Sequence, residues 1–430
     1  MEKKELELYI HIPFCVKKCA YCDFLSFCAD EKTQQSYVEA LKKEIRFYGD
    51  YFQDRKLVTI FIGGGTPSWL DGTQIREILD TVYSVFCVEQ DAEITIECNP
   101  GTATAQKFDD YKAAGINRLS IGLQSANNEE LQLLGRIHTF EQFLKMYDLA
   151  RKKGFTNINI DLMSSLPGQT IESFEKTLRT VLKLKPEHIS AYSLIIEEGT
   201  PFYERYQEDA KRQAEGEPTV WLPSEEEEYA ITKLTQKLLQ EAGYHWYEIS
   251  NFAKPGYECR HNIGYWKRAD YLGVGLGAAS LIDNVRYANT RDLYEYLEAC
   301  RHIYMDDAAR SESENCDVTG DKMVFLASDC RNNKVQLTDT EIGKINLHET
   351  AERLTRTEQM EEFMFLGMRM LDGICRSEFE WNFGTTVEAV YGDVLRKLTE
   401  EGLLQKQEGR LFLTEKGMDI NNYVVEQFML

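Results

Sequence analysis

Short apolar runs alternate with longer amphipathic segments along the first half of the chain. The runs are rich in isoleucine and carry few charges, which is typical of strands buried on both faces of a parallel sheet. Strands are predicted at residues 8–12, 58–62, 93–97, 118–122, 157–161 and 189–194. Amphipathic helices are predicted between them, at residues 32–48, 72–86, 103–114, 140–153 and 171–184. Six β/α units in series indicate an α/β fold with right-handed crossovers, and the pattern leaves open whether the sheet is an open barrel or doubly wound.

The second half of the chain departs from this alternation. Residues 203–228 are strongly charged and are interpreted as a surface excursion that leads into a helix at 225–242. Residues 301–356 are polar with little periodicity, which indicates an insertion or linker. Beyond them the pattern predicts helices and a hairpin with its turn at Glu408 and Gly409, as in a winged helix. The predicted domains are therefore a core at 1–200, an extension at 201–300, the insertion or linker at 301–356 and a C-terminal domain at 357–430.

Charge and hydropathy exclude several classes of protein. The chain of 430 residues has a net charge of -22, which argues against a nucleic-acid partner held mainly through phosphate contacts. No run of 18 apolar residues occurs, so no membrane span is expected. The first residues show no apolar signal segment, and the predicted location is the cytoplasm.

Three of the eleven cysteines crowd together near the amino terminus, at Cys15, Cys19 and Cys22, in the pattern C-x3-C-x2-C. Thiolates so spaced, on a loop after a predicted strand, can bind zinc or an iron–sulfur cluster. Structural zinc normally needs four ligands, and no second C-x2-C follows; His11 lies in a strand pattern and is better interpreted as a strand residue. Three thiolates on a four-iron cluster leave one iron open for a substrate.

The cysteine stretch, with the aromatic Tyr21 directly before its third cysteine, resembles the signature of the radical S-adenosylmethionine (SAM) superfamily. That resemblance implies a 4Fe-4S cluster on Cys15, Cys19 and Cys22, with SAM at the open iron. It also implies that the first half is a partial (β/α)6 TIM-type radical-SAM barrel, followed here by the C-terminal, mostly helical, winged-helix-like domain.

Glycines and polar residues follow the predicted strands, where ligands bind in α/β folds. Glycines let a backbone approach a ligand, a carboxylate can bind ribose hydroxyls, and an arginine can bind a carboxylate. A single such residue is more often part of a turn or a surface ion pair, but recurrence at successive strand ends favours a site. By resemblance, the SAM-site positions are Tyr9, Tyr21, Gly64, Gly65, Thr66, Glu97, Gln124, Arg136 and Asp161.

Within the superfamily the whole set resembles the HemN/HemW branch, which contains oxygen-independent coproporphyrinogen III dehydrogenases and haem chaperones. The dehydrogenases carry a further cysteine where this chain has Phe24, and a longer amino-terminal extension. The stretch HNIGYW matches the HNxxYW motif of the chaperones. It implies haem binding by His261, Asn262, Tyr265 and Trp266, with His261 as the ligand of the haem iron. The alternative is that His261 and the aromatic side chains pack a domain junction.

This resemblance implies a cytoplasmic haem chaperone that binds a 4Fe-4S cluster, SAM and haem, and delivers haem to membrane-bound respiratory haem enzymes. Membrane association would run through these clients, because an acidic surface does not drive adsorption to anionic lipid. The alternative is a radical-SAM enzyme acting on a tetrapyrrole, such as a coproporphyrinogen III dehydrogenase. Everything needed for SAM cleavage matches, so the question of enzymatic activity stays open. Phe24 and the short amino-terminal region favour the chaperone.

Overall fold

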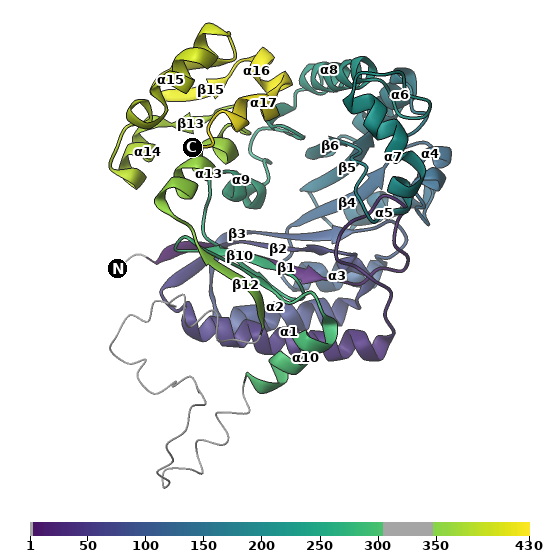
Figure 1. The fold of residues 1–430 in the computed structure, drawn as a ribbon. Coiled ribbons are helices and arrows are strands. Elements are labelled where there is room, and N and C mark those ends of the chain that lie inside the picture. The colour runs from purple at the N-terminus through teal and green to yellow at the C-terminus, as the bar shows by residue number, and fades with distance from the viewer. Residues whose placement is uncertain (1–2, 304–346) are drawn as a thin grey trace.

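A parallel sheet lies at the centre of the computed structural model, which describes residues 3–303 and 347–430 (Figure 1). Six parallel strands lie side by side in chain order. They are β1 (Lys4–Ile12), β2 (Arg55–Gly64), β3 (Cys87–Cys98), β4 (Arg118–Gln124), β5 (Ile158–Ser164) and β6 (His188–Ser193). A doubly wound sheet would reverse this order at a switch point, so the unbroken order selects the open barrel. The prediction of a partial (β/α)6 barrel is confirmed.

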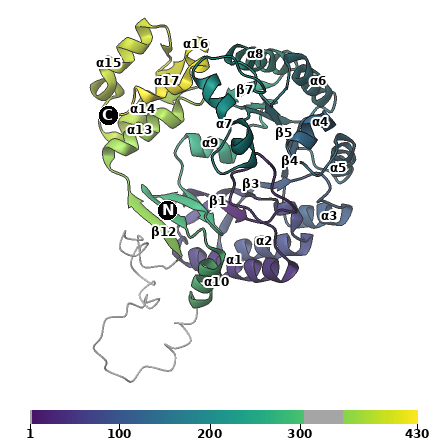
Figure 2. The same cartoon turned by 45° about the vertical axis from the view of Figure 1, so that its right-hand side comes forward.

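The helices between these strands surround the curved sheet on its outer face (Figure 2). They are α1 (Glu31–Tyr51), α2 (Gly72–Val85), α3 (Ala105–Ala113), α4 (Asn128–Leu133), α5 (Phe140–Lys152) and α6 (Ile171–Leu182). Asp30, Thr104, Thr139 and Thr170 each precede a helix and accept a hydrogen bond from its first turn, which fixes the starting residue. The short helix α4 is absent from the sequence prediction because six residues are too few to show a helical period.

The strands β1, β2 and β3 begin earlier than predicted. β3, for example, starts at Cys87, whereas the sequence predicts a strand only from residue 93. The amino-terminal halves carry charged residues such as Lys4, Glu89 and Asp91. Only the apolar carboxyl-terminal halves of these strands form runs with few charges, so only these halves are recognisable as strands in the sequence.

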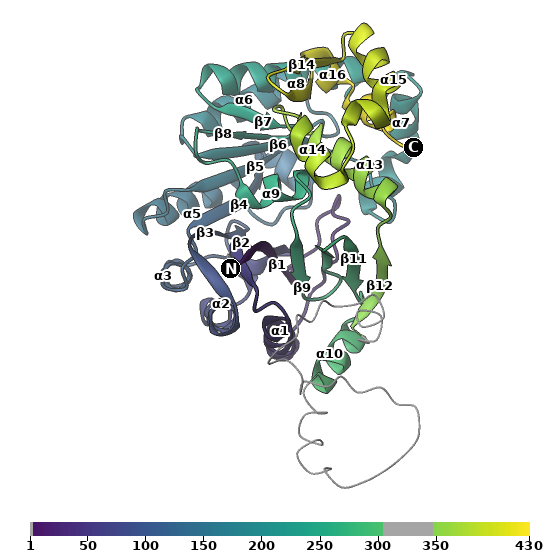
Figure 3. The same cartoon turned by 90° about the vertical axis from the view of Figure 1, so that its left-hand side faces the viewer.

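Further strands extend the sheet at both edges, to a total of twelve within the described residues. Beyond β6 lies β8 (Asn251–Ala253), which is antiparallel to β6, and then β7 (His245–Glu248), which is antiparallel to β8. On the other side β9 (Tyr271–Val274) runs parallel to β1, and an antiparallel flap follows (Figure 3). The flap consists of β10 (Ala279–Ile282), β11 (Val285–Asn289) and β12 (His348–Arg353). Most of the segment predicted as an insertion or linker, 304–346, lies outside the described residues, but its end forms β12.

The charged stretch interpreted as a surface excursion is partly helical. Helix α7 (Pro201–Ala214) occupies its first half, with Thr200 as its N-cap, and α8 (Glu225–Glu241) follows. Between them, Asp209 accepts hydrogen bonds from the backbone amides of residues 220, 221 and 222. The carboxylate thereby ties the connecting loop to α7, a contact between distant residues that composition does not reveal.

The C-terminal domain is mostly helical with a small hairpin, as predicted. It comprises α13 (Arg356–Gly367), β13 (Ile374–Cys375), α14 (Arg376–Phe383), α15 (Val387–Glu400), β14 (Leu404–Gln407), β15 (Arg410–Leu413), α16 (Glu415–Asp419) and α17 (Asn421–Glu426). The hairpin turns at Glu408 and Gly409, both with positive φ, which suits the twist of a two-residue turn. Buried Glu362 joins the domain to the core through ion pairs of 2.7 Å with Arg268 and Arg286. No helix in residues 3–303 or 347–430 is long and apolar enough to span a membrane.

Candidate functional site

The three clustered cysteines lie on the loop that connects β1 to α1, at the carboxyl end of the sheet. The base of the loop is closed by backbone hydrogen bonds between Cys15 and Phe27, 3.0 Å, and between Phe27 and Pro13, 2.8 Å. Cys15, Cys19 and Cys22 are half-buried and free of disulfides. Three free thiols on one loop are the donor set that an iron–sulfur cluster uses. Among the residues that the structure describes, no three His, Cys, Asp or Glu side chains gather closely enough to hold a single metal ion.

A chain of hydrogen bonds connects two of these thiols to the ends of the neighbouring strands. Cys15 Sγ lies 3.4 Å from Thr66 Oγ1, just beyond β2, and Thr66 accepts a bond of 2.7 Å from Asn99 Nδ2, just beyond β3. Asn99 Oδ1 in turn accepts from Arg136 Nη2 at 2.6 Å, and Arg136 Nη1 donates to Cys19 Sγ at 3.7 Å. The guanidinium of Arg136 thus fixes the position of the Cys19 sulfur relative to the ends of β2 and β3. Asn99 is absent from the predicted site residues, although it lies only two residues after the predicted strand at 93–97.

Two buried carboxyl groups of the barrel, Glu97 and Asp161, lie close enough for the charge of one to affect the other. Glu97 accepts a hydrogen bond of 3.1 Å from the Gly64 backbone amide. Burial, and to a smaller extent the charge of Asp161, raise the pKa of Glu97 to about 8. Asp161 accepts from Asn159 at 2.7 Å and from Ser120 at 3.1 Å, and burial raises its pKa as well. The structure thus brings together two carboxyl groups from β3 and β5 that are far apart in the sequence.

The remaining predicted SAM-site residues lie in the same region. Gln124, at the end of β4, has a positive φ of 70° and accepts a hydrogen bond of 2.9 Å from Tyr192. Tyr21 lies beside Arg136, and burial raises the pKa of its hydroxyl. A Cβ at Gly122 would meet both Gln124 and Arg136, so this glycine allows the two side chains to approach each other.

The glycines at the end of β2, Gly64 and Gly65, also allow close packing within the protein itself. A Cβ at Gly64, where φ is +111°, would lie 2.5 Å from the His11 ring. A Cβ at Gly65 would lie 2.8 Å from the Phe14 carbonyl oxygen. In this structure the close neighbours of both glycines are therefore parts of β1 and the cysteine loop, which the glycines allow to pack against β2.

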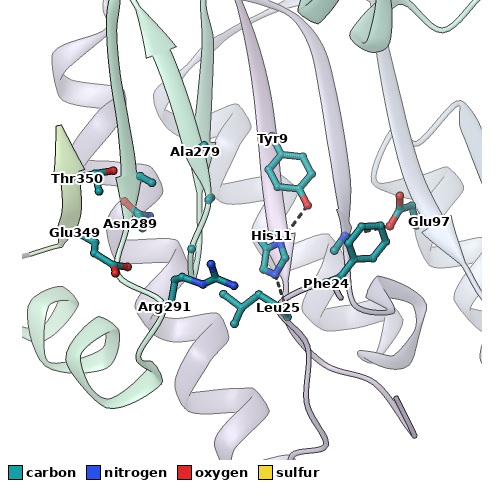
Figure 4. A pocket seen from close by; sticks show the side chains of 14 residues that line it. Tyr9, His11, Phe24, Leu25, Glu97, Ala279, Asn289, Arg291, Glu349 and Thr350 are labelled. Atoms are coloured by element: carbon teal, nitrogen blue, oxygen red, sulfur yellow. Dashed lines mark hydrogen bonds between the residues drawn. The ribbon is translucent and has the colours of Figure 1, made fainter. Parts of the chain in front are cut away.

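A cavity of about 510 Å³ opens between the core strands and the flap (Figure 4). From the core it is lined by Tyr9, His11, Gly64 and Glu97, and from the cysteine loop by Phe24 and Leu25. The opposite wall comes from residues 277–279, 288, 289, 291, 349 and 350, none of which the sequence analysis singled out. Within the cavity His11 Nδ1 lies 3.0 Å from the Tyr9 hydroxyl, and Nε2 donates to the Leu25 carbonyl at 3.0 Å. Both ring nitrogens of His11 are therefore engaged, which agrees with its interpretation as a strand residue.

The histidine of the HNxxYW motif lies deeper in the barrel, on α9 (Arg260–Trp266). Its side chain is 1% exposed and stacks on Phe61 with ring centroids 5.2 Å apart. Nδ1 of His261 lies 2.7 Å from Thr59 Oγ1, and Nε2 lies 3.0 Å from the Tyr265 hydroxyl. Burial, and to a smaller extent the charge of Arg118, lower the pKa of His261 to about 3. Neither ring nitrogen is free to bind iron in this arrangement.

The aromatic residues of the motif do not share one open face. Tyr265 packs edge-on between His261 and Tyr271, with centroid distances of 4.8 and 4.7 Å. Trp266 instead lies beneath the guanidinium of Arg369, 4.5 Å from its ring centroid, where the C-terminal domain meets the core. Asn262 is half-buried on the same helix. The structure therefore separates His261 and Trp266, which the expected haem site would have brought together.

An open parallel barrel with three free thiols at its carboxyl end defines the class of radical SAM proteins, and comparison with known proteins agrees. Residues 9–181 match the radical SAM superfamily, and residues 354–420 match the HemN C-terminal domain. The chain belongs to the HemN/HemW family of radical SAM proteins. This family implies a 4Fe-4S cluster and SAM.

Several relatives carry the name heme chaperone HemW. The protein from Lactococcus lactis is 33% identical over all of this chain and 99% of its own length. The one from Bacillus subtilis is also 33% identical, over 98% of each chain. The Escherichia coli relative is 44% identical over 64% of this chain and 69% of its own. Among solved structures, coproporphyrinogen III oxidase (HemN) from Escherichia coli, described as a radical SAM enzyme, is similar with a TM-score of 0.77 and 25% identity. That likeness covers 100% of this chain and 91% of the other.

Proposed function

We propose that this protein is a haem chaperone that binds a 4Fe-4S cluster, SAM and haem. The observation that carries the proposal is the hydrogen-bonded chain that runs from Cys15 through Thr66, Asn99 and Arg136 to Cys19. It orients the cysteine loop towards the strand ends where the other predicted SAM-site residues lie. The haem role rests on the relatives named heme chaperone. As a chaperone it would pass haem from the cytoplasm to membrane-bound respiratory haem enzymes.

In this proposal Cys15, Cys19 and Cys22 hold the cluster, and SAM lies beside it. When reduced, such a cluster supplies one electron to SAM. In this proposal the positive charge of Arg136 lies beside the cysteine ligands and helps to hold them in place. Arg136 holds Cys19 and has its second nitrogen on the Gly122 carbonyl, 2.7 Å away, which fixes the guanidinium inside the site. The SAM contacts are assigned to Tyr9, Tyr21, Gly64, Gly65, Thr66, Glu97, Gln124, Arg136 and Asp161.

The assignment of haem to the motif on α9 carries a structural condition. For His261 to bind iron, one ring nitrogen must lose its hydroxyl partner, Thr59 or Tyr265, and the ring, which is 1% exposed, must become accessible, so α9 must move away from the barrel. Asn262, Tyr265 and Trp266 would move with it. The proposal for these four residues is therefore that they bind haem only in a second arrangement of α9.

A second candidate function is that of a radical-SAM enzyme acting on a tetrapyrrole. The likeness to coproporphyrinogen III oxidase over the whole chain favours it. Against it stands Phe24, at the position where the dehydrogenases carry a further cysteine. In this candidate the same SAM-site residues would serve a reaction on bound substrate.

The test uses anaerobically purified protein with a reconstituted cluster. Cys19→Ser should lose the brown iron–sulfur chromophore, whereas Cys98→Ser, a buried cysteine outside the loop, should keep it. Retention of the full chromophore by Cys19→Ser would refute the ligand set. Haem titration of wild type should give saturable binding. Formation of protoporphyrinogen from coproporphyrinogen III, SAM and a reductant would instead establish the second candidate.

A further inference from the structure

The cavity between the cysteine loop and the flap has one flat, apolar side. The wall on the side of the flap includes three residues with a small side chain or none, namely Gly277, Ala279 and Ala288. Leu25 packs directly against Gly277, and Phe24, which is 68% exposed, lines the cavity on the side away from Ala279 (Figure 4). The volume of about 510 Å³ lies within the usual range for organic ligands. An exposed aromatic ring that faces small side chains across a cavity suits a flat apolar molecule.

The same cavity contains an arginine that has no partner among the described residues. Arg291 follows β11, and Figure 4 shows its guanidinium extending into the cavity towards Leu25. The described residues give Arg291 no hydrogen bond and no ion pair, although the chain has 71 acidic and only 49 basic residues. Glu349 lines the same wall but is not paired with it. A free guanidinium at the edge of an apolar cavity favours a ligand that carries a carboxylate.

A flat apolar body with carboxylates at its edge is the chemistry of haem. We propose that haem docks in this cavity, with its macrocycle between Phe24 and the alanines of the flap and a propionate on Arg291. The proposal rests on the proposed function, namely that the protein binds haem, and it names the place. Both nitrogens of His11 are hydrogen-bonded, so docking rests on the macrocycle and the propionate.

This site differs from the HNxxYW motif. Thr59, the partner of His261, precedes Gly64 of the cavity by five residues on β2, about 16 Å along a strand. The cavity needs no rearrangement of α9, whereas binding at His261 does. Tyr9, Gly64 and Glu97 line the cavity and also belong to the predicted SAM site, so haem and SAM would be neighbours.

The test removes the contact between Arg291 and a haem propionate in two ways, by changing the protein and by changing the ligand. Haem and its propionate diester are titrated into cluster-reconstituted wild type and Arg291→Gln. Loss of a charged hydrogen-bonded pair should weaken haem binding about tenfold or more. The diester should bind wild type as weakly as haem binds Arg291→Gln, and the two losses should not add. Arg46→Gln, an exposed arginine on α1 outside the cavity, is the matched control and should leave the affinity unchanged.

Two further variants test whether the negative charge of Glu349 weakens haem binding and whether haem needs the free volume of the cavity. Glu349→Gln removes the negative charge beside Arg291 and should tighten haem binding, while Ala279→Phe fills the cavity and should abolish it. The chromophore and the melting temperature of each variant serve as folding controls. If wild type binds haem and Arg291→Gln and Ala279→Phe bind it equally well, the cavity is not the site, although the proposed function stands. If wild type binds no haem, the proposed function itself fails.

Discussion

Replacing His261 with alanine should destabilise the fold, whatever the replacement does to haem binding. The imidazole is buried between Thr59, Phe61 and Tyr265. It forms hydrogen bonds with the hydroxyl groups of Thr59 and Tyr265. A variant made to test haem ligation therefore also removes part of the barrel interior. The size of that effect decides how a haem titration of the variant is interpreted.

The magnitude follows from the contacts. Truncation leaves the hydroxyls of Thr59 and Tyr265 without their partner, at about 1 kcal/mol or more each. Loss of ring packing against Phe61 costs about 1 kcal/mol. The sum is about 3 kcal/mol. The entropy of unfolding is about 2.1 cal/mol/K per residue, or about 0.9 kcal/mol/K for 430 residues, so the melting temperature should fall by about 3 °C.

The assay is thermal unfolding of the cluster-free protein, followed by circular dichroism at neutral pH. Tyr265→Phe removes one of the two hydroxyl contacts and should give a smaller fall than His261→Ala. His245→Ala is the matched control, because that side chain is 51% exposed and should shift the midpoint by less than about 1 °C. Equal midpoints for wild type, His261→Ala and His245→Ala would refute the structural role of His261.

Three other predictions follow from buried groups at the site and beside it. Gly64→Ala should lower stability, because the new Cβ would lie 2.5 Å from the His11 ring at a φ of +111°. Gly154→Ala is the control, because Gly154 also has a positive φ, +82°, but has no neighbour closer than 4.0 Å; equal melting temperatures for the two variants would contradict the effect of the contact. Arg136→Lys should weaken SAM binding, measured by calorimetry, since a lysine cannot replace its planar fork; unchanged affinity would contradict that role. Glu44 is fully buried, and burial raises its pKa from 4.5 to about 7. Its neutral form therefore contributes stability that is complete below pH 4.5 and is lost as pH rises to 7. Urea unfolding at pH 5 and pH 8 should show the advantage of wild type over Glu44→Gln shrinking at the higher pH, and a constant difference would disprove the shift.

Much of the site was accessible from the sequence because its signals are local. The cysteines Cys15, Cys19 and Cys22 lie on one loop, so their spacing can be recognised directly in the sequence. Glu97 and Gln124 stand at the ends of strands, and the strand ends could be located from apolar runs. Since parallel strands place their carboxyl ends at one edge of the sheet, polar residues at the ends of successive apolar runs were predicted to share one site.

Other parts of the site depend on contacts between distant segments. Asn99 is defined by its bond to Arg136, which is 37 residues away in the chain. Arg291 acquires its place because β9 pairs with β1 and carries the flap back to the cysteine loop. No local pattern marks either residue, because the sequence does not show whether the side chain of an arginine or an asparagine has a hydrogen-bond partner in the folded protein.

By itself, the sequence determined the α/β alternation, the cysteine loop and the family. Each of these depends on periodicity or spacing over a few residues. Only the tertiary structure decided where His261 points. Pairing of Glu7 with Tyr271 between β1 and β9 draws α9 against the barrel, and Gly264 packs so closely that a Cβ would lie 1.8 Å from the Glu7 carboxylate. The burial of a side chain is a property of all the segments that surround it, and a motif of six residues cannot encode them.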